Sequence, residues 1–131
     1  FNNVDIADIG DAGGLQNSAT AGSLYIALHT ADPGEAGNAT TSESAYGSYA
    51  RQAVARSGAG WTVSGNSATN AALIQFPECT SGSETITHVS ITTAVSGASK
   101  ILYSGALSAS RSVSSGIQPQ FAAAALTVTE D

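Results

Sequence analysis

The chain has 131 residues, only 11% of them charged, and a formal net charge of −6. This length predicts one domain with room for a hydrophobic core. The four basic residues are too few for the phosphate contacts of a nucleic-acid binder, and they also disfavour attachment to an anionic membrane. No apolar run reaches the length of a membrane-spanning helix. The single cysteine, Cys79, excludes an internal disulfide and a multi-cysteine zinc site, so we expect a small, partly buried apolar side chain.

Residues 1–20 are predicted to form an extended N-terminal arm, because they are polar and rich in glycine. Val4, Ile6 and Ile9 form a short apolar stripe in this arm. The stripe is too small to fold alone, so the arm either lies on its own domain or reaches a neighbour.

The arm also carries a regular series of acidic residues. Asp5, Asp8 and Asp11 are spaced three residues apart, which differs from the D-x-D-x-D-G spacing of a calcium loop. We therefore interpret them as a solvated or partner-facing acidic surface, and a calcium site is the alternative.

Residues 23–34 give the strongest strand signal in the chain. Leu24, Ile26 and Leu28 occupy alternate positions, which places them on one face that we expect to point into the core. Pro33 then ends the strand, because proline has no backbone N–H for a sheet ladder.

A polar loop follows this strand and ends in Tyr46 and Tyr49. The two rings predict a small aromatic patch where the loop returns to the fold. Core or rim packing is the preferred interpretation of these rings, and stacking on a ligand is the alternative.

Further strand patterns alternate with Gly, Ser and Asn turns along the rest of the chain. We expect the strands at 51–56 and 61–63 to pair as a hairpin across the turn at 57–60. The remaining strands are predicted at residues 67–76, 84–93 and 100–107, with a last strand that includes the alanine run 122–125. Residues 108–113 follow the strand at 100–107 and lead to a turn at Gly116.

Two of these strands carry more specific patterns. Within residues 67–76, Ala72, Ile74 and Phe76 are expected to share one face.

Within residues 84–93, Ile86 falls on the opposite face from Val89 and Ile91. This pattern predicts either partial burial of both faces or a β-bulge.

The pattern as a whole predicts an all-β fold, because about seven to nine short strands alternate with turns and almost no helix signal is present. We expect an antiparallel β-sandwich or jelly-roll-like domain over residues 21–131, preceded by the arm of residues 1–20. The Cys…Trp…Cys spacing of an immunoglobulin domain is absent.

The sequence shows no catalytic or cofactor motif that would indicate an enzyme. The nucleophile-elbow and nucleotide-binding glycine patterns do not occur, and no carboxylate pair stands out. His29 and His88 fall on strands, and a structural role is preferred to metal binding or catalysis because no third ligand has clear spacing. We therefore expect no catalytic residue, no cofactor and no metal.

Several long phrases of the sequence resemble a family of small virion proteins of tailed bacteriophages. They are LYIALHTADPGEAG, YGSYAR, VARSGAGWTVSGNSATNAALIQFP, KILYSGALSAS and PQFAAAALTVTED, and the resemblance runs from about Asp5 to the C-terminus. Members of this family are described as head decoration (cement) proteins or as tail-fibre and minor tail proteins.

The resemblance implies a capsid decoration protein, located on the virion surface and not an enzyme. Such a protein binds the major capsid protein, usually as a homotrimer, and stabilises the shell by linking neighbouring capsomers. The residues expected to contact a partner are Phe1, Val4, Ile6, Ile9, Tyr46 and Tyr49.

Two alternatives remain at this stage. A tail or tail-fibre component with a host-binding role would use Tyr46, Tyr49 and Trp61 as exposed aromatic side chains. A glycan hydrolase would instead need a pair of carboxylates facing one groove.

Overall fold

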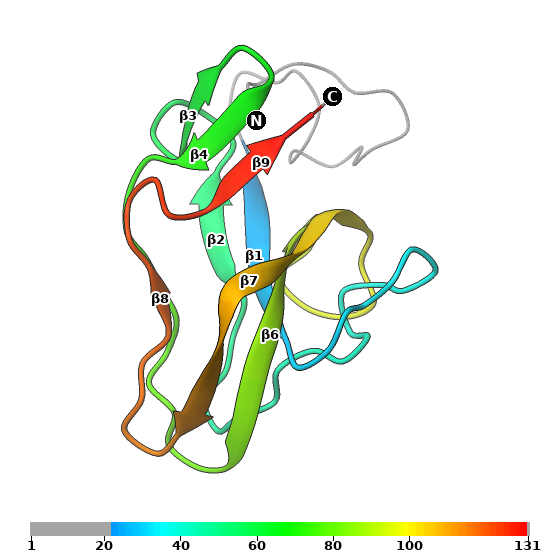
Figure 1. Cartoon of the computed structure of the whole chain (residues 1–131), viewed down its shortest axis with the longest axis vertical. Coiled ribbons are helices and arrows are strands. Elements are labelled where there is room, and N and C mark those ends of the chain that lie inside the picture. The colour runs from blue at the N-terminus through cyan, green and yellow to red at the C-terminus, as the bar shows by residue number, and fades with distance from the viewer. Residues whose placement is uncertain (1–21, 131) are drawn as a thin grey trace. The chain divides into compact units, whose positions relative to one another are not determined.

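The computed structural model describes residues 22–130, and this part of the chain is all-β, with nine strands and no helix (Figure 1). The predicted all-β, antiparallel fold class is confirmed. Within the same residues, no helix has the length and hydropathy needed to cross a membrane. The strands are β1 (Ser23–His29), β2 (Gln52–Ala55), β3 (Trp61–Ser64), β4 (Ser67–Asn70), β5 (Ile74–Gln75), β6 (Ser83–Thr92), β7 (Ile101–Ser114), β8 (Gln120–Phe121) and β9 (Thr127–Thr129).

The described residues divide into two compact units. One unit contains the small sheet β3-β4-β9, and the other contains β6, β7 and most of β1. The units comprise residues 22–24, 53–74 and 120–130 in the first and residues 25–52 and 75–119 in the second. The arm predicted at residues 1–20 lies outside the described part of the chain.

The four-stranded sheet has the order β2-β1-β6-β7, and β1 lies in its interior. Leu24, Ile26 and Leu28 are all buried, as predicted from their alternation. The other face of β1 is also covered, since Ala27 and His29 are fully buried. An interior strand covered on both faces explains why this stretch gave the strongest apolar signal.

The pairing of β6 with β7 changes register between Ile86 and His88, and the extra residues, 107–110, lie on β7 opposite Thr87. Along β6, Ile86, Ser90 and Thr92 alternate with Val89 and Ile91, and all five are buried. Both faces of the strand are therefore partly buried, which is the first of the two predicted alternatives.

Strand β7 extends well beyond the predicted residues 100–107 and ends at Ser114. It lies at the edge of the four-stranded sheet, beside β6 (Figure 1). Residues 108–113, for which no strand was predicted, belong to the same strand.

The predicted hairpin between residues 51–56 and 61–63 is wrong. β2 joins the sheet of β1, whereas β3 pairs with β4 across a turn in which Gly65 has φ +58°. The turn before β3 is closed on itself, because the backbone N–H groups of Gly60 and Trp61 both donate to Ser57 O at 3.0 Å. This closure redirects the chain, and the buried Trp61 starts a different sheet.

Residues 67–76 do not form the single strand that was predicted. β4 ends at Asn70, and Ala72 is exposed rather than buried with Ile74 and Phe76. The reason is local: Asn70 Nδ2 donates to Ala72 O at 2.8 Å, which bends the chain away from the ladder.

The alanine run 122–125 is an exposed turn and not part of the last strand, which corrects a third prediction. Ala124 has φ +61° and its N–H donates to Asn70 O at 2.8 Å. Asn70 Nδ2 also donates to Ala122 O at 2.8 Å, and Asn70 Oδ1 accepts from Leu126 N at 2.8 Å. The buried Asn70 therefore holds the turn that precedes β9.

Candidate functional site, a buried polar network and an exposed sheet edge

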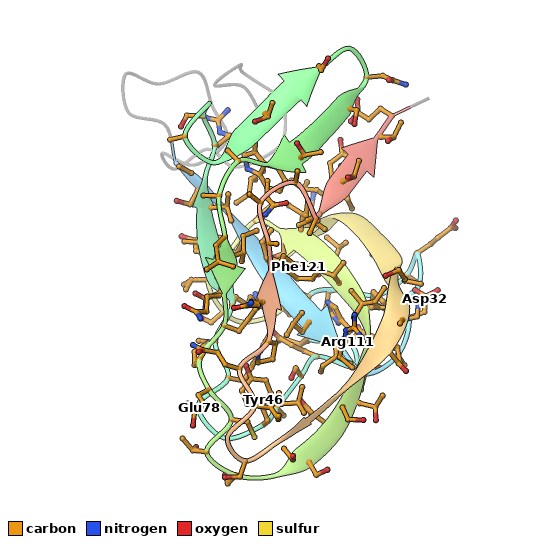
Figure 2. The ribbon with its side chains drawn as sticks, turned by 60° about the vertical axis from the view of Figure 1, so that its left-hand side comes forward. Asp32, Tyr46, Glu78, Arg111 and Phe121 are labelled. Carbon is orange, nitrogen blue, oxygen red and sulfur yellow. The ribbon has the colours of Figure 1, made fainter. Side chains whose placement is uncertain are left out.

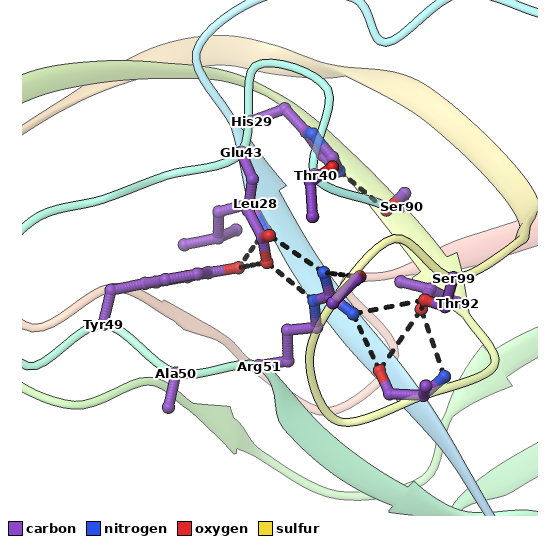
Figure 3. Close-up of polar contacts among 12 residues, drawn as sticks. Leu28, His29, Thr40, Glu43, Tyr49, Ala50, Arg51, Ser90, Thr92 and Ser99 are labelled. Carbon is purple, nitrogen blue, oxygen red and sulfur yellow. Dashed lines mark hydrogen bonds and ion pairs between the residues drawn. The ribbon is translucent and has the colours of Figure 1, made fainter. Parts of the chain in front are cut away.

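The second unit contains a buried ion pair between Arg51 and Glu43 (Figure 3). Arg51 Nε donates to Glu43 Oε1 at 2.6 Å, and Arg51 Nη2 donates to Glu43 Oε2 at 2.9 Å. The contact is therefore bidentate and charge-assisted, which is the strongest geometry for an arginine and a carboxylate. The side chain of Arg51 is 2% exposed, and hydrogen bonding to Glu43 raises the pKa of Arg51.

Arg51 also holds the turn between β6 and β7. Its Nη1 donates to Ala94 O at 2.9 Å and to Ser99 Oγ at 3.2 Å, and its Nη2 donates to Gly97 O at 2.8 Å. With the two bonds to Glu43, all five N–H donors of the guanidinium are used. A buried arginine with every donor satisfied can stabilise two loops without any ligand.

Tyr49 extends the network to β1. Its hydroxyl accepts from Leu28 N at 3.0 Å and donates to Glu43 Oε1 at 3.2 Å. Its ring stacks on Phe76 at 6.2 Å between centroids with an interplanar angle of 8°. Burial raises the pKa of Tyr49, so the hydroxyl keeps its proton and its donor role.

Tyr46 lies in the same loop and is only 4% exposed. Its hydroxyl donates to Pro77 O at 2.8 Å, and burial raises the pKa of Tyr46 to about 12. Its ring meets the Tyr49 ring edge to face, 5.4 Å between centroids, which agrees with the preferred packing interpretation. Figure 2 marks the place of Tyr46.

The alternative that needed exposed aromatic rings is wrong for Tyr46 and Trp61. Trp61 is 2% exposed, so neither ring is available to stack on a host ligand. The partner contact predicted at Tyr46 and Tyr49 stays a prediction.

His29 and Ser90 form a second buried contact. His29 Nε2 lies 2.7 Å from Ser90 Oγ, and His29 Nδ1 lies 2.9 Å from Thr41 O. Because a carbonyl only accepts, Nδ1 carries the proton and Nε2 accepts from the serine hydroxyl. This is the hydrogen bond that a general base makes to a nucleophile.

The burial of this pair favours a structural role. His29 is 0% exposed and Ser90 is 1% exposed, so a substrate has no route to the hydroxyl without opening the sheet. Burial also lowers the pKa of His29, which keeps the ring neutral. The two hydrogen bonds of His29 instead connect the loop after β1, at Thr41, to Ser90 on β6.

His88 stands directly opposite His29 in the β1–β6 register. Its Nδ1 lies 2.8 Å from Thr87 Oγ1. Between residues 22 and 130, no group of three or more His, Cys, Asp or Glu side chains is placed to hold a metal ion. Cys79 is buried, as expected, and its thiol donates to Ser81 O at 3.2 Å.

The exposed feature of the second unit is the middle of β7. From Ser104 to Ser112 every residue except the half-buried Leu107 is exposed, on both faces of the strand. Arg111 lies within this stretch (Figure 2).

The first unit presents a different surface, on the small sheet β3-β4-β9. The register places hydroxyl side chains in two rows across the three strands, and apolar Ala68 and Val128 face the core. This face carries no charge. Its rows are Thr62, Thr69 and Thr127, and Ser64, Ser67 and Thr129.

Sequence reasoning missed the roles of Glu43, Arg51 and Asn70. Glu43 lies in a loop interpreted only as polar, and Arg51 begins the strand predicted at residues 51–56. One signal was present. A buried arginine is nearly always paired, and the loop before Arg51 contains few carboxylates that could be its partner. The contact residues Phe1, Val4, Ile6 and Ile9 lie outside the described residues.

Comparison with known proteins places the chain in a family. No curated protein matches it. Residues 11–129 match the family described as Podophage GP4 fiber I protein gp80, a range that includes all nine described strands. The expected relation to phage virion proteins is confirmed, and the family's name fits the fibre alternative at least as well as head decoration. This chain therefore belongs to the podophage GP4 fiber I protein gp80 family and is a structural protein of a phage virion.

Proposed function

We propose that this protein is a non-catalytic structural subunit of the virion fibre. The observation that carries the proposal is the match of residues 11–129 to a phage fibre protein family. The proposal assigns no cofactor, no nucleic acid and no membrane surface as a partner. Its partners are other virion proteins and further copies of the same chain.

The buried network supports a rigid building block. Arg51 connects the loop that carries Glu43 to the turn at residues 94–99, and Tyr49 connects it to β1. Ser44 Oγ and Ala45 N add bonds from this loop to the Glu84 carboxylate. A fibre transmits load through its subunits, and loops fixed by internal bonds resist deformation without a ligand.

Head decoration is the second candidate, and the hydroxyl face of the small sheet favours it. Short Ser and Thr side chains lose little rotamer entropy when they are covered, so this face suits close packing on a protein shell. In this form the protein binds the major capsid protein on the head surface, as a homotrimer.

Labelling of purified virions separates the two candidates. Gold-conjugated antibody against the protein is imaged on intact particles, and its copy number is measured by quantitative mass spectrometry. Label on the fibres with a low copy number supports the fibre proposal. Label spread over the head with a high copy number overturns it and supports decoration.

Virions disrupted into separated heads and tails provide the control, because the protein then follows the particle to which it is bound. Protein absent from both fractions contradicts both candidates.

A further inference from the structure

One histidine connects the loop after β1 to the interior of the four-stranded sheet. His29 is the last residue of β1, and its ring is fully buried. Its Nδ1 donates to Thr41 O in the loop at 2.9 Å. Its Nε2 accepts from Ser90 Oγ on β6 at 2.7 Å (Figure 3). The neutral ring with its proton on Nδ1 therefore satisfies both neighbours.

A second proton on the His29 ring disrupts the contact with Ser90. Both nitrogens of a charged imidazole are donors, so the serine hydroxyl has to give up its donation to Nε2. Ser90 is 1% exposed, and within residues 22–130 its side chain makes no other hydrogen bond. Protonation therefore leaves the hydroxyl proton without an acceptor and places a charge in the interior.

The surroundings of His29 also decide between the neutral and the charged ring. Burial is the largest effect and lowers the pKa of His29, and Arg51 and His88 lower it further, whereas Thr41 O and Glu43 raise it. His88 stands directly opposite His29 in the β1–β6 register, so protonation of both rings places like charges at paired positions. The closed loop therefore prefers the neutral ring.

The loop has a fixed base and a strained residue directly beside Thr41. Glu43 is held by the bidentate contact with Arg51, so the chain is anchored two residues after Thr41. Ser42, between them, has φ +52°, a left-handed conformation that is uncommon for a residue with a side chain. Such a conformation persists only where neighbouring contacts hold it. Release of Thr41 removes one of these contacts and favours a change of backbone conformation at Ser42.

Two further backbone hydrogen bonds depend on closure of the loop. Ala39 N–H donates to Ser99 O at 2.9 Å, and Thr30 N–H donates to Ser42 O at 2.9 Å. Ala39 is also fully buried. The amides of Ala39 and Thr30 are therefore protected from solvent exchange only while the loop is closed.

We propose that protonation of His29 releases residues 30–42 from the sheet, while Glu43 keeps the base of the loop attached. The contacts of His29 with Thr41 and Ser90 thus form an acid-sensitive switch within the subunit, and the inference holds for either location on the virion.

Linkage gives the pH window of this switch. In the open form the ring is exposed and has the ordinary pKa of about 6.5, whereas in the closed form the pKa of His29 is lowered. The open form therefore binds more protons as the pH falls through about 6.5. Its equilibrium constant is expected to rise about tenfold between about pH 7.5 and about pH 5.5.

Amide hydrogen exchange of the full-length protein, followed by NMR at these two pH values, measures the opening. Rates corrected for intrinsic chemical exchange give the opening constant at each amide. We expect the constants at Ala39 and Thr30 to rise about tenfold at the lower pH. Because the opening is local, we also expect them to be insensitive to low urea, whereas amides that exchange through global unfolding respond to it.

Proton–nitrogen correlation spectra of the imidazole rings test the geometry on which the switch depends. We expect His29 to carry its proton on Nδ1 at about pH 7.5, as its contact with Thr41 O requires. The ring signals missing from His29→Gln identify this residue. A proton on Nε2 in place of Nδ1 overturns the inference.

Three variants separate the effect of the ring from other causes. His29→Gln removes the titrating ring and keeps a side chain that can donate and accept, so the pH dependence at Ala39 is expected to disappear. Ser90→Ala removes the hydroxyl that favours the neutral ring, so the rise is expected to be smaller than in the native protein. Ser110→Ala, at an exposed position of β7, is the matched control and is expected to keep the full rise.

Several results overturn the inference. They are equal opening constants at the two pH values, an unchanged rise in His29→Gln, equal effects of Ser90→Ala and Ser110→Ala, and a urea response at Ala39 equal to that of global unfolding. The measurements on the native protein decide the matter even if a variant does not fold. None of these results changes where the protein is located on the virion, so the proposed function is judged separately.

Discussion

Arg51 and Glu43 face each other side-on, with 2.6 Å between Nε and Oε1 and 2.9 Å between Nη2 and Oε2. They are eight residues apart in the chain, yet they join loops that follow different strands, because Arg51 also binds the carbonyl groups of Ala94 and Gly97. The stability of the second unit therefore depends on one arginine that the solvent hardly reaches.

Replacing Arg51 by alanine is expected to lower the free energy of unfolding by about 3 kcal/mol, because it leaves the Glu43 carboxylate and three acceptors of the 94–99 turn without their donor. Urea unfolding followed by circular dichroism measures the change. Arg111→Ala is the matched control, since Arg111 is exposed and is expected to change the free energy by less than about 0.5 kcal/mol. Equal losses for the two variants would contradict the role given to the buried pair.

Stability is expected to fall on mild acidification because of His29. Burial lowers its pKa below the ordinary 6.5, so the unfolded chain binds more protons than the folded chain as the pH falls through that value. The contribution of His29 is therefore complete above about pH 7 and is lost progressively below about pH 6.5.

Unfolding curves of native protein and His29→Gln between about pH 5 and pH 7.5 measure this dependence. Several groups around His29 also act on its pKa: Thr41 O and Glu43 raise it, while Arg51 and His88 lower it. We expect the native slope to flatten in His29→Gln. A slope that persists in His29→Gln would assign the dependence to other groups.

Asn70→Ala is expected to destabilise the first unit by about 2 kcal/mol, since the carbonyl of Ala122 and the buried N–H of Leu126 lose their side-chain partner. Asn66→Ala is the control, because Asn66 Nδ2 donates to Glu130 O at an exposed position. Chemical denaturation compares the two variants. If Asn66→Ala lowered the free energy of unfolding as much as Asn70→Ala, the role given to Asn70 would be contradicted.

Deletion of residues 1–14 is expected to weaken binding of the protein to virions that lack it, while the unfolding midpoint of the domain stays near that of the native chain. The physical reason is that the arm has too little apolar surface to contribute a core of its own. Sedimentation of the protein with depleted particles measures the bound fraction. Full occupancy by the truncated protein would show that the arm makes no contact needed for attachment.

The interior of the large sheet was predictable because its signals are local. Alternation in β1 identified Leu24, Ile26 and Leu28 as core residues, and the phase of Ile86 indicated either partial burial of both faces of β6 or a bulge. Strand period and side-chain burial follow from neighbouring residues along one strand, so the sequence carries them directly.

The polar residues were less predictable because their partners are distant in sequence. Asn70 holds the turn at residues 122–125 by binding backbone groups more than fifty residues away, where a strand was predicted. A long-range hydrogen bond of this kind leaves no trace in the local pattern. The pairing of β2 was also not predictable from the local pattern, because β2 pairs with β1 and not with β3, the next strand in the sequence.

An all-β chain with few charged residues, a strongly apolar first strand and a resemblance to phage virion proteins all followed from the sequence. Composition and strand periodicity carry these properties, since each depends on a residue and its near neighbours. The three-dimensional structure was needed to show which cations are buried, that His29 bonds to Ser90 in a closed interior, and that both exposed cations lie along β7. Burial and pairing depend on contacts between strands. The order of strands in a sheet is set by packing between segments that are distant in the sequence.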